Sequence, residues 1–197
     1  MGTSHYFDAD PAAASAPRSV TFALPDVTVA LQTDRGVFSA GRVDPGTHLL
    51  MLEAPPPPPA GELLDLGCGY GPIAVVLARR APGARVWAVD VNARARALTA
   101  ANARAAGADN VTVVSPDDVP ASLRFAAIYS NPPVRIGKAG LHELLAAWVP
   151  RGEVTWLVVS KHLGADSLAA WMSGQGWEVS RRVSRVSYRL LEVRPGA

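Results

Sequence analysis

The sequence predicts an α/β protein with a doubly wound, mostly parallel sheet of seven strands, of the Rossmann-like kind. Two observations predict it. From residue 61 onward, short apolar runs alternate with helical stretches, and a glycine-rich turn joins the first apolar run to its helix. Such alternation is typical of parallel strands whose connecting helices cover the sheet. The last two apolar runs are close enough in sequence to form an antiparallel hairpin at one edge of that sheet.

The chain divides into three predicted parts. Residues 1–54 form a small β-rich extension, in which two short strands precede a helix that Asp44 is expected to cap. Residues 55–60 include five consecutive prolines and predict a stiff linker, because polyproline is extended. Residues 61–197 form the main domain. The expected strands are 20–24, 27–31, 63–66, 85–90, 111–114, 125–130, 154–159, 177–182 and 187–193, and the expected helices are 47–53, 73–80, 92–106, 139–148 and 166–173.

Composition and charge are those of a globular protein, with 49% hydrophobic and 18% charged residues and a net charge of +2. The main domain carries 16 of the 19 Lys and Arg residues against 11 acids, which suits a polyanionic partner or an ordinary solvated surface. The same two interpretations apply to a group of arginines near the C-terminus. They are Arg181, Arg182, Arg185, Arg189 and Arg194.

The cysteine and histidine content excludes some classes of site. A single cysteine, Cys68, cannot form a disulfide within the chain or a cysteine zinc cluster, and the histidines lack metal-ligand spacing. No apolar run approaches the ~20 residues that a membrane span needs. The first residues do not resemble a signal peptide either. We therefore expect a cytoplasmic protein with neither a metal nor a membrane partner.

The first site motif is the glycine turn. It consists of the strand Leu63–Leu66, the glycines Gly67, Gly69 and Gly71, and Pro72 at the first position of a helix. Glycine permits a tight turn and the close approach of a ligand, and the helix N-terminus offers free N–H groups. A dinucleotide fingerprint would need a glycine at residue 72, so Pro72 disfavours an NAD oxidoreductase. The pattern is instead Asp-x-Gly-x-Gly-x-Gly, which starts at Asp65. A glycine turn without a ligand is the alternative.

An acidic residue, Asp90, ends the second strand of the main domain, about twenty residues after the glycine turn. An acid at this position can accept hydrogen bonds from both hydroxyls of a ribose. The alternative is an acid that only stabilises the N-terminus of the following helix.

The second site motif is Ser130-Asn131-Pro132-Pro133, at the end of the fourth strand of the main domain. A proline disfavours helical backbone in the residue before it, so Asn131 is held extended, and the second proline stiffens the turn. The side-chain oxygen of Asn131 and the carbonyl oxygen of Pro132 are two acceptors that suit an exocyclic NH₂ group. Both hydrogen bonds together would aim the amine nitrogen at a methyl group, and alignment alone can contribute ~7–11 kcal/mol.

The glycine motif resembles motif I of class I S-adenosyl-L-methionine (SAM) methyltransferases, and the chain as a whole resembles one family of them. This family is the bacterial small-subunit (16S) rRNA guanine-N2 methyltransferases with their single-domain relatives, and the likeness covers most of residues 5–193. It rests on the phrases Gly36–Thr47, Asp65–Ile73, Val89–Asn92, Ser130–Pro133, Arg135–Lys138, Leu141–Leu145 and Lys161–Ala165. The resemblance implies methylation of a guanine exocyclic amine in 16S rRNA.

The resemblance also implies a set of site residues. SAM would be the cofactor, and its binding residues would be Asp65, Gly67, Gly69, Gly71, Asp90 and Asp117. Asp65 would help to hold the amino group of the methionine moiety. Asp117 would lie against the adenine, although Ser115-Pro116 leaves the register open to the adjacent Asp118, and either acid could instead be a solvated residue of a turn. The catalytic turn would be Asn131, Pro132 and Pro133, and the substrate contacts would be Val134, Arg135 and Lys138. The implied partner is RNA, either 16S rRNA or the small ribosomal subunit.

The chain departs from the family pattern at three places. Relatives usually carry an aromatic residue after Asn-Pro-Pro, which stacks on the target base, whereas this chain has Val134. The segment between Trp148 and Gly152 is short, and Val186-Ser187 stand where relatives often have Lys-Gly. Two alternatives therefore stay open. The acceptor could be another amine, adenine N6 or protein glutamine, or the protein could be a SAM- or RNA-binding module with little activity.

Overall fold

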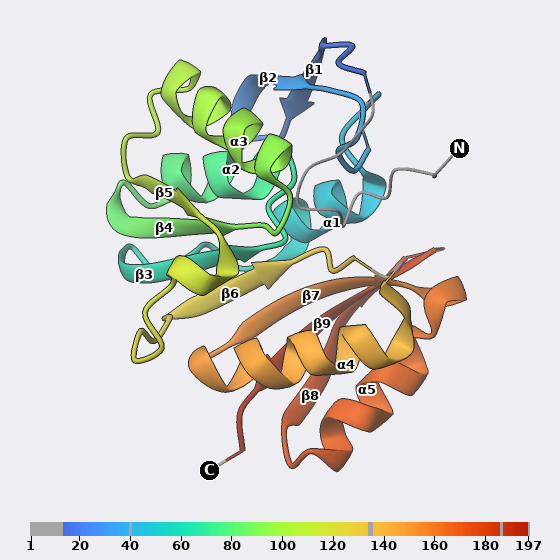
Figure 1. Ribbon diagram of the computed structural model, residues 1–197. Helices are drawn as coiled ribbons and strands as arrows, with labels where there is room; N and C mark the ends of the chain where they lie inside the picture. The colour runs from blue at the N-terminus through green and yellow to red at the C-terminus, as the bar shows by residue number, and fades with distance from the viewer. Residues whose placement is uncertain (1–13, 40, 134–135, 186, 197) are drawn as a thin grey trace.

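The structure is a computed structural model that describes residues 14–39, 41–133, 136–185 and 187–196. Within these residues, a two-stranded hairpin accompanies a seven-stranded sheet with helices on both faces (Figure 1). The strands are β1 (Arg18–Ala23), β2 (Thr28–Thr33), β3 (Ala60–Leu66), β4 (Gly83–Val89), β5 (Val111–Val114), β6 (Ala127–Ser130), β7 (Thr155–Ser160), β8 (Glu178–Ser184) and β9 (Tyr188–Arg194). The helices are α1 (Pro45–Glu53), α2 (Pro72–Arg80), α3 (Ala93–Ala105), α4 (Gly137–Trp148) and α5 (Ala165–Gly174), with 3-10 turns η1 (Pro116–Asp118), η3 (Val149–Arg151) and η4 (Lys161–Leu163).

The large sheet has the strand order β5-β4-β3-β6-β7-β9-β8. The five strands from β5 to β7 are parallel, and β9 pairs antiparallel with both β7 and β8. The predicted fold class is confirmed, including the antiparallel hairpin at one edge. The order reverses between β3 and β6, and ligands of open α/β sheets bind beyond the carboxyl ends of the strands at such a switch point.

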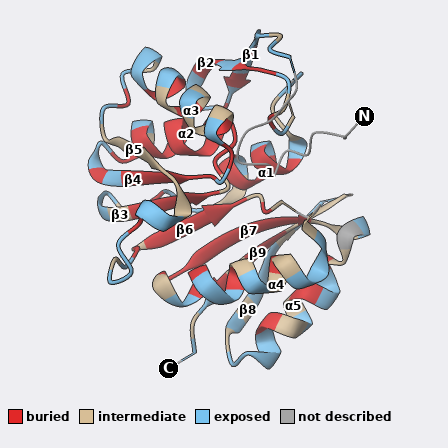
Figure 2. Cartoon of the chain, viewed as in Figure 1, coloured by how far each residue is buried: buried red, intermediate tan, exposed pale blue. Residues whose placement is uncertain are grey.

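Apolar side chains cover both faces of the central strands, because this sheet is buried between two layers of helices (Figure 2). In β3, Leu63 joins the core beneath α1, α2 and α3, whereas its neighbour Leu64 joins the core on the opposite face. Residues of α4 and α5 pack on that opposite face, over β7 and β9. Each strand therefore contributes to two cores, which explains the near-continuous apolar runs of the sequence.

The N-terminal segment is packed against the main sheet. Phe22 of β1 and Leu31 of β2 belong to the same hydrophobic core as α2, and α1 lies against β7 and β9. The side chain of Asn102 in α3 bonds both the N–H and the C=O of Gln32 in β2, at 2.7 and 2.8 Å. The proline run between these parts is packed against the rest of the protein at Pro57, which is buried. Residues 18–54 therefore share one core with the main domain.

Most element boundaries lie within a few residues of their predicted positions, and Asp44 caps α1 as predicted. The strand expected from residue 125 begins only at Ala127. The reason is tertiary. Phe125 forms an isolated bridge with Gly152, and its N–H donates to the carbonyl of Arg151 instead of joining the β3 ladder.

Candidate active site

A cavity of about 760 Å³ lies at the carboxyl ends of β3, β4 and β6. Its wall is formed by the segment before α1, by the ends of these three strands and of β7, and by the start of β9. Gly67, Asp90 and Asn131, each predicted from a different motif, all line it. The structure therefore brings the glycine turn, the acid after β4 and the Asn-Pro-Pro turn together at the topological switch point.

The glycine turn is fixed by backbone geometry that glycine alone adopts without strain. Gly67, Gly69 and Gly71 have φ of 80°, 59° and 92°, all in the left-handed region. A Cβ on Gly71 would lie 3.0 Å from Cγ2 of Thr99 in α3, so a side chain has no room there either. The N–H groups of Gly67 and Cys68 both donate to the carbonyl of Val89, which ties the turn to the end of β4.

Asp90 links the glycine turn to the next helix while it faces the cavity. Its side chain is buried, and its two oxygens accept hydrogen bonds from the N–H groups of Gly69 and Asn92, each at 2.9 Å. These two bonds fix the glycine turn to the start of α3, and Asp90 also lines the cavity.

Asp65 lies beneath the turn, fully buried. One oxygen accepts from the N–H of Ala74 in the first turn of α2, at 2.9 Å, and the other has no hydrogen-bond partner among the described residues. Burial raises the pKa of this carboxyl to about 8; the Ala74 hydrogen bond opposes this, and the charge of Asp90 adds to it. Asp65 is not part of the cavity wall itself.

The raised pKa of Asp65 predicts how stability changes with pH. The unfolded carboxyl loses its proton near 3.8, whereas the folded one keeps it until about 8. The folded state therefore binds the extra proton, and the stabilisation is lost as pH rises from about 4 to about 8, by up to ~1.4 kcal/mol per pH unit. Urea unfolding without cofactor should show that the free energy of unfolding of the wild type falls relative to that of Asp65→Asn as the pH rises across this range. A constant difference would contradict the prediction, and Asp117→Asn is the exposed control.

The Asn-Pro-Pro turn lies beside the glycine turn, because β6 pairs with β3, and a Cβ on Gly67 would lie only 3.8 Å from Cδ of Pro133. Pro132 and Pro133 line the cavity, and the Ser130 hydroxyl donates to the carbonyl of Leu66 in β3, at 2.7 Å. The side-chain nitrogen of Asn131 donates to Oδ1 of Asp44, at 2.8 Å, and to Oγ1 of Thr47, at 3.0 Å. The turn is therefore attached to β3 on one side and to the start of α1 on the other.

Several predicted site residues lie elsewhere. Asp117 is exposed and does not line the cavity, whereas the preceding Pro116 does. Lys138 is exposed in a separate recess of about 120 Å³, together with His142 and Ser167. Gly69 lines a small recess beside the main cavity, and Gly71 stands at the N-terminus of α2. Val134 and Arg135 lie outside the described residues.

The sequence motifs missed part of the cavity wall. Phe38 and Asp44 come from the segment before α1, and Tyr188 comes from β9. Phe38 is 44% exposed, which is unusual for a phenyl ring in a folded domain. Asp44 was recognisable only as a helix cap. No local pattern shows that this cap faces a turn 87 residues away.

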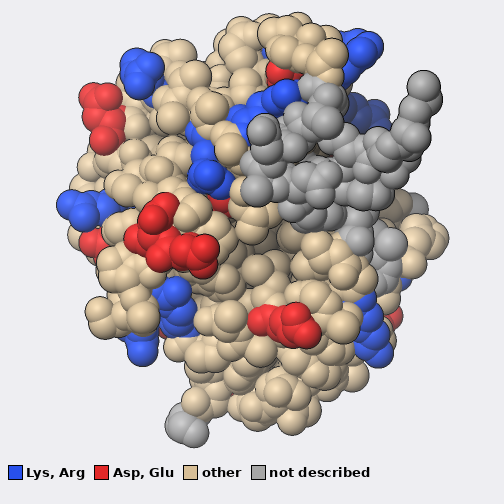
Figure 3. Space-filling view, in the orientation of Figure 1, with Lys and Arg blue, Asp and Glu red and all other residues tan. Residues whose placement is uncertain are grey.

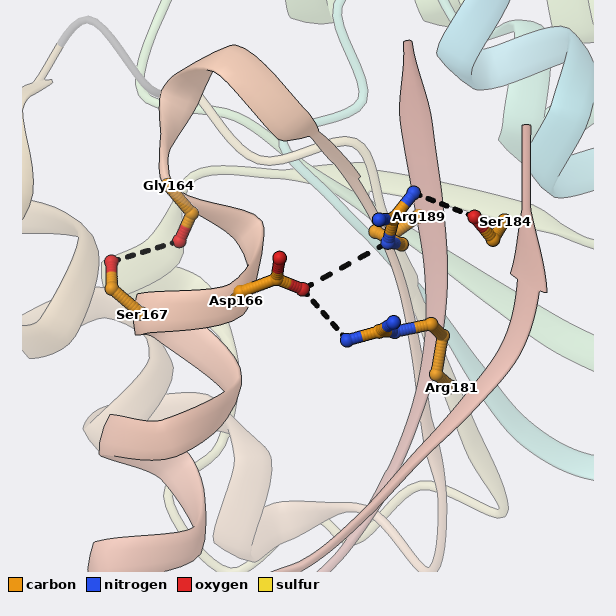
Figure 4. A network of polar contacts seen from close by, with 6 residues as sticks. All are labelled: Gly164, Asp166, Ser167, Arg181, Ser184 and Arg189. Atoms are coloured by element: carbon orange, nitrogen blue, oxygen red, sulfur yellow. Dashed lines mark hydrogen bonds and ion pairs between the residues drawn. The ribbon is translucent and has the colours of Figure 1, made fainter. Parts of the chain in front are cut away.

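The arginines of the C-terminal hairpin are paired with acids. Figure 3 shows basic and acidic side chains interspersed on one face of the molecule. Asp166 of α5 lies 2.7 Å from Arg181 and 3.8 Å from Arg189 (Figure 4). The remaining pairs are Arg182 and Arg194 with Glu192, and Arg185 with Glu53. This pairing favours a solvated surface over a free cationic face.

Among the described residues, no three His, Cys, Asp or Glu side chains are grouped as ligands of a metal ion. No helix in the described part of the chain has the length and apolar character to cross a membrane.

Together, the Rossmann-like sheet, the glycine turn and the acid after β4 define a class I methyltransferase, the class whose cofactor is SAM. The sequence model of the methyltransferase small domain family matches residues 28–181. The chain belongs to this family, which confirms the resemblance seen in its motifs. It is 32% identical to the uncharacterized protein YbxB of Bacillus subtilis, over 98% of each chain.

Two longer proteins are also similar. Ribosomal RNA small subunit methyltransferase C of Pseudomonas aeruginosa is 41% identical over 52% of this chain, and the match spans 30% of that protein. The structure of the T. thermophilus 16S rRNA N2 G1207 methyltransferase, in complex with AdoMet and guanosine, superposes with a TM-score of 0.72. It is 24% identical, and the superposition covers 94% of this chain and 52% of that one. The latter likeness shows the fold.

The residues at the cavity fit SAM. The left-handed glycines leave backbone without side chains beside the cavity, where Gly67 can lie under a ligand. Asp90 lines the cavity and is an acid of the kind that holds ribose hydroxyls in related sheets. The oxygen of Asp65 that has no hydrogen-bond partner among the described residues lies beneath the same turn. When bound, SAM supplies a methyl group activated on a sulfonium.

Proposed function

We propose that this protein transfers a methyl group from SAM to an exocyclic amine of RNA, and that the amine is guanine N2 of 16S rRNA. The observation that carries the proposal is the Asn-Pro-Pro turn in the wall of the same cavity as Gly67 and Asp90. The names of the similar Pseudomonas and T. thermophilus proteins support the rRNA target. The matches span only 30% and 52% of the lengths of those two proteins.

The chemistry requires orientation more than acid or base catalysis. The lone pair of an exocyclic NH₂ is delocalised into the base, so the nitrogen is a poor nucleophile. The side-chain oxygen of Asn131 and the carbonyl oxygen of Pro132 would accept its two N–H groups and aim its lone pair along the cavity. The nitrogen would take the methyl group as the carbon–sulfur bond of the sulfonium breaks and a neutral thioether leaves, and it would then lose a proton to water. Held in line, the reactants gain most of their rate from alignment.

The cavity also offers an aromatic surface. Relatives place an aromatic residue after Asn-Pro-Pro, and this chain has Val134 there. Phe38 lines the cavity from the N-terminal segment, with 44% of its surface exposed. Base–aromatic stacking contributes ~1–3 kcal/mol per base. The ring of Phe38 is therefore a surface on which the target base can stack.

The test is transfer of labelled methyl from SAM to four acceptors in parallel: 30S subunits, free 16S rRNA, tRNA and ribosomal protein. We expect label in 30S subunits or 16S rRNA, and recovery of N2-methylguanosine after digestion to nucleosides. Label in N6-methyladenosine or in protein would instead support one of the other amine acceptors. SAM binding with no transfer to any acceptor would identify a binding module and contradict the proposal.

A further inference from the structure

The side-chain amide of Asn131 has both its N–H groups engaged at the start of α1. The nitrogen donates to Oδ1 of Asp44, at 2.8 Å, and to Oγ1 of Thr47, at 3.0 Å. An amide nitrogen has two N–H donors and no acceptor capacity. With both donors used in this direction, the amide oxygen is the atom that remains for the cavity that Asn131 lines.

Asp44 determines which way the amide points. An ionised carboxylate only accepts hydrogen bonds, so a flipped Asn131 would set its oxygen against another acceptor and leave both without a donor. Thr47 alone cannot impose this choice, because a hydroxyl can donate as well as accept. The orientation of Asn131 therefore follows from the chemistry of its carboxylate partner.

Asp44 is itself held in place. Its Oδ1 accepts from the N–H groups of Gly46, at 2.8 Å, and Thr47, at 3.3 Å, as the N-cap of α1. A Cβ on Gly46 would lie 2.9 Å from Oδ1 of Asp44 and 2.8 Å from Cε1 of Tyr188. The start of α1 is thus closely packed between the carboxylate and a ring of the cavity wall.

We propose that Asp44 is a positioning residue, which holds the Asn131 amide with its oxygen toward the acceptor amine. This inference rests on the proposed function, because an NH₂ acceptor needs an oxygen there and not a second NH₂ group. Asp44, which also lines the cavity, would act on the acceptor through Asn131. A residue that the sequence marks as a helix cap would thereby control the acceptor half of the site.

The test separates two roles of Asp44, the orientation of the Asn131 amide and the capping of α1. Serine is also a favoured N-cap, but it is shorter than aspartate and its hydroxyl can donate, so Asp44→Ser keeps the cap and removes the constraint. We expect kcat for methyl transfer to fall at least tenfold, with the SAM Kd within twofold of wild type. Asp34→Asn is the matched control. Asp34 is a buried acid of the N-terminal segment that accepts backbone N–H groups, as the partly buried Asp44 does, and it does not line the cavity.

A double-mutant cycle tests whether Asp44 acts through Asn131. In an Asn131→Ala background, Asp44→Ser should lower kcat no further, because the side chain to be oriented is absent. An equal fall in both backgrounds would overturn the inference. So would a loss of SAM affinity as large as the loss of kcat.

A measurement without substrate keeps this inference separate from the proposed function. The side-chain ¹⁵N–¹H signals of Asn131 should show hydrogens protected from exchange in the wild type, and unprotected ones in Asp44→Ser. If protection depends on Asp44 while no acceptor is methylated, the orientation stands and the proposed function fails. If the hydrogens exchange equally fast in both proteins, the orientation by Asp44 is wrong whatever the activity.

Discussion

Replacing Asn131 with alanine should lower kcat by roughly a hundredfold or more, the usual effect of removing one preorganised hydrogen-bonding group from an active site. The SAM Kd should stay nearly unchanged. Asn131 is expected to touch the acceptor amine, and its oxygen matters most when the nitrogen is being methylated. An interaction made in the transition state lowers kcat and kcat/KM together when it is removed.

Steady-state kinetics with the acceptor found in the transfer assay, and calorimetry with SAM, check this result. Asn110→Ala is the matched control. Asn110 also has a side-chain nitrogen with two hydrogen bonds, to the carbonyls of Ala81 and Ala84, but it lies outside the cavity wall. Its replacement should cost stability and leave kcat near wild type. If Asn131→Ala instead weakens SAM binding as much as turnover, the turn supports the cofactor and not the acceptor.

Asp90→Ala should weaken SAM binding by roughly ten- to a hundredfold, because hydrogen bonds to a charged group contribute ~1.5–3 kcal/mol. Two effects act in the same direction. The ribose hydroxyls would lose their acceptor, and the N–H of Gly69 would lose the oxygen that fixes the glycine turn. Asp90→Asn separates them, since an amide oxygen can still accept from one backbone N–H while the charge is removed.

Titration calorimetry on folded protein decides between these roles. Asp90→Asn should bind SAM with an affinity between wild type and Asp90→Ala, with a melting temperature closer to wild type. An unchanged SAM Kd in Asp90→Ala would mean that this carboxylate only serves the N-terminus of α3. Asp118→Ala, at an exposed acid in the turn after β5, provides the control.

The fold was predictable because its signals are local. Strand β5 occupies the predicted residues, and the cap of α1 and the glycine turn follow from residue types at adjacent positions. The predicted start of β6 was wrong because the start depends on Gly152, which is 27 residues further along the chain and bridges to Phe125. Local patterns determine where elements form, whereas the partners of each strand determine where it ends.

The site was only partly predictable for the same reason. Gly67, Asp90 and Asn131 stand at strand ends, and strand ends of a parallel sheet meet at one edge. The sequence could not show that Asp65 is buried under the turn. Alternation along β3 predicts that Asp65 and Gly67 are on the same face of the sheet, but it does not predict how deeply the Asp65 side chain is buried. Nor could the sequence show that an acid of another element, Asp166 of α5, pairs with two of the C-terminal arginines.

The pairing of β3 with β6 has a consequence for how the chain folds. These neighbours are joined across 64 residues by the bond from Ser130 to Leu66, and Asn131 meets Asp44 across 87 residues. Contacts between residues so far apart require the closure of long loops, and they slow folding relative to local contacts. Hairpins such as β1–β2 need no such closure. A chain still emerging from a ribosome therefore has no complete site until β6, β7 and the start of β9, which all contribute to the cavity wall, have been synthesised and docked.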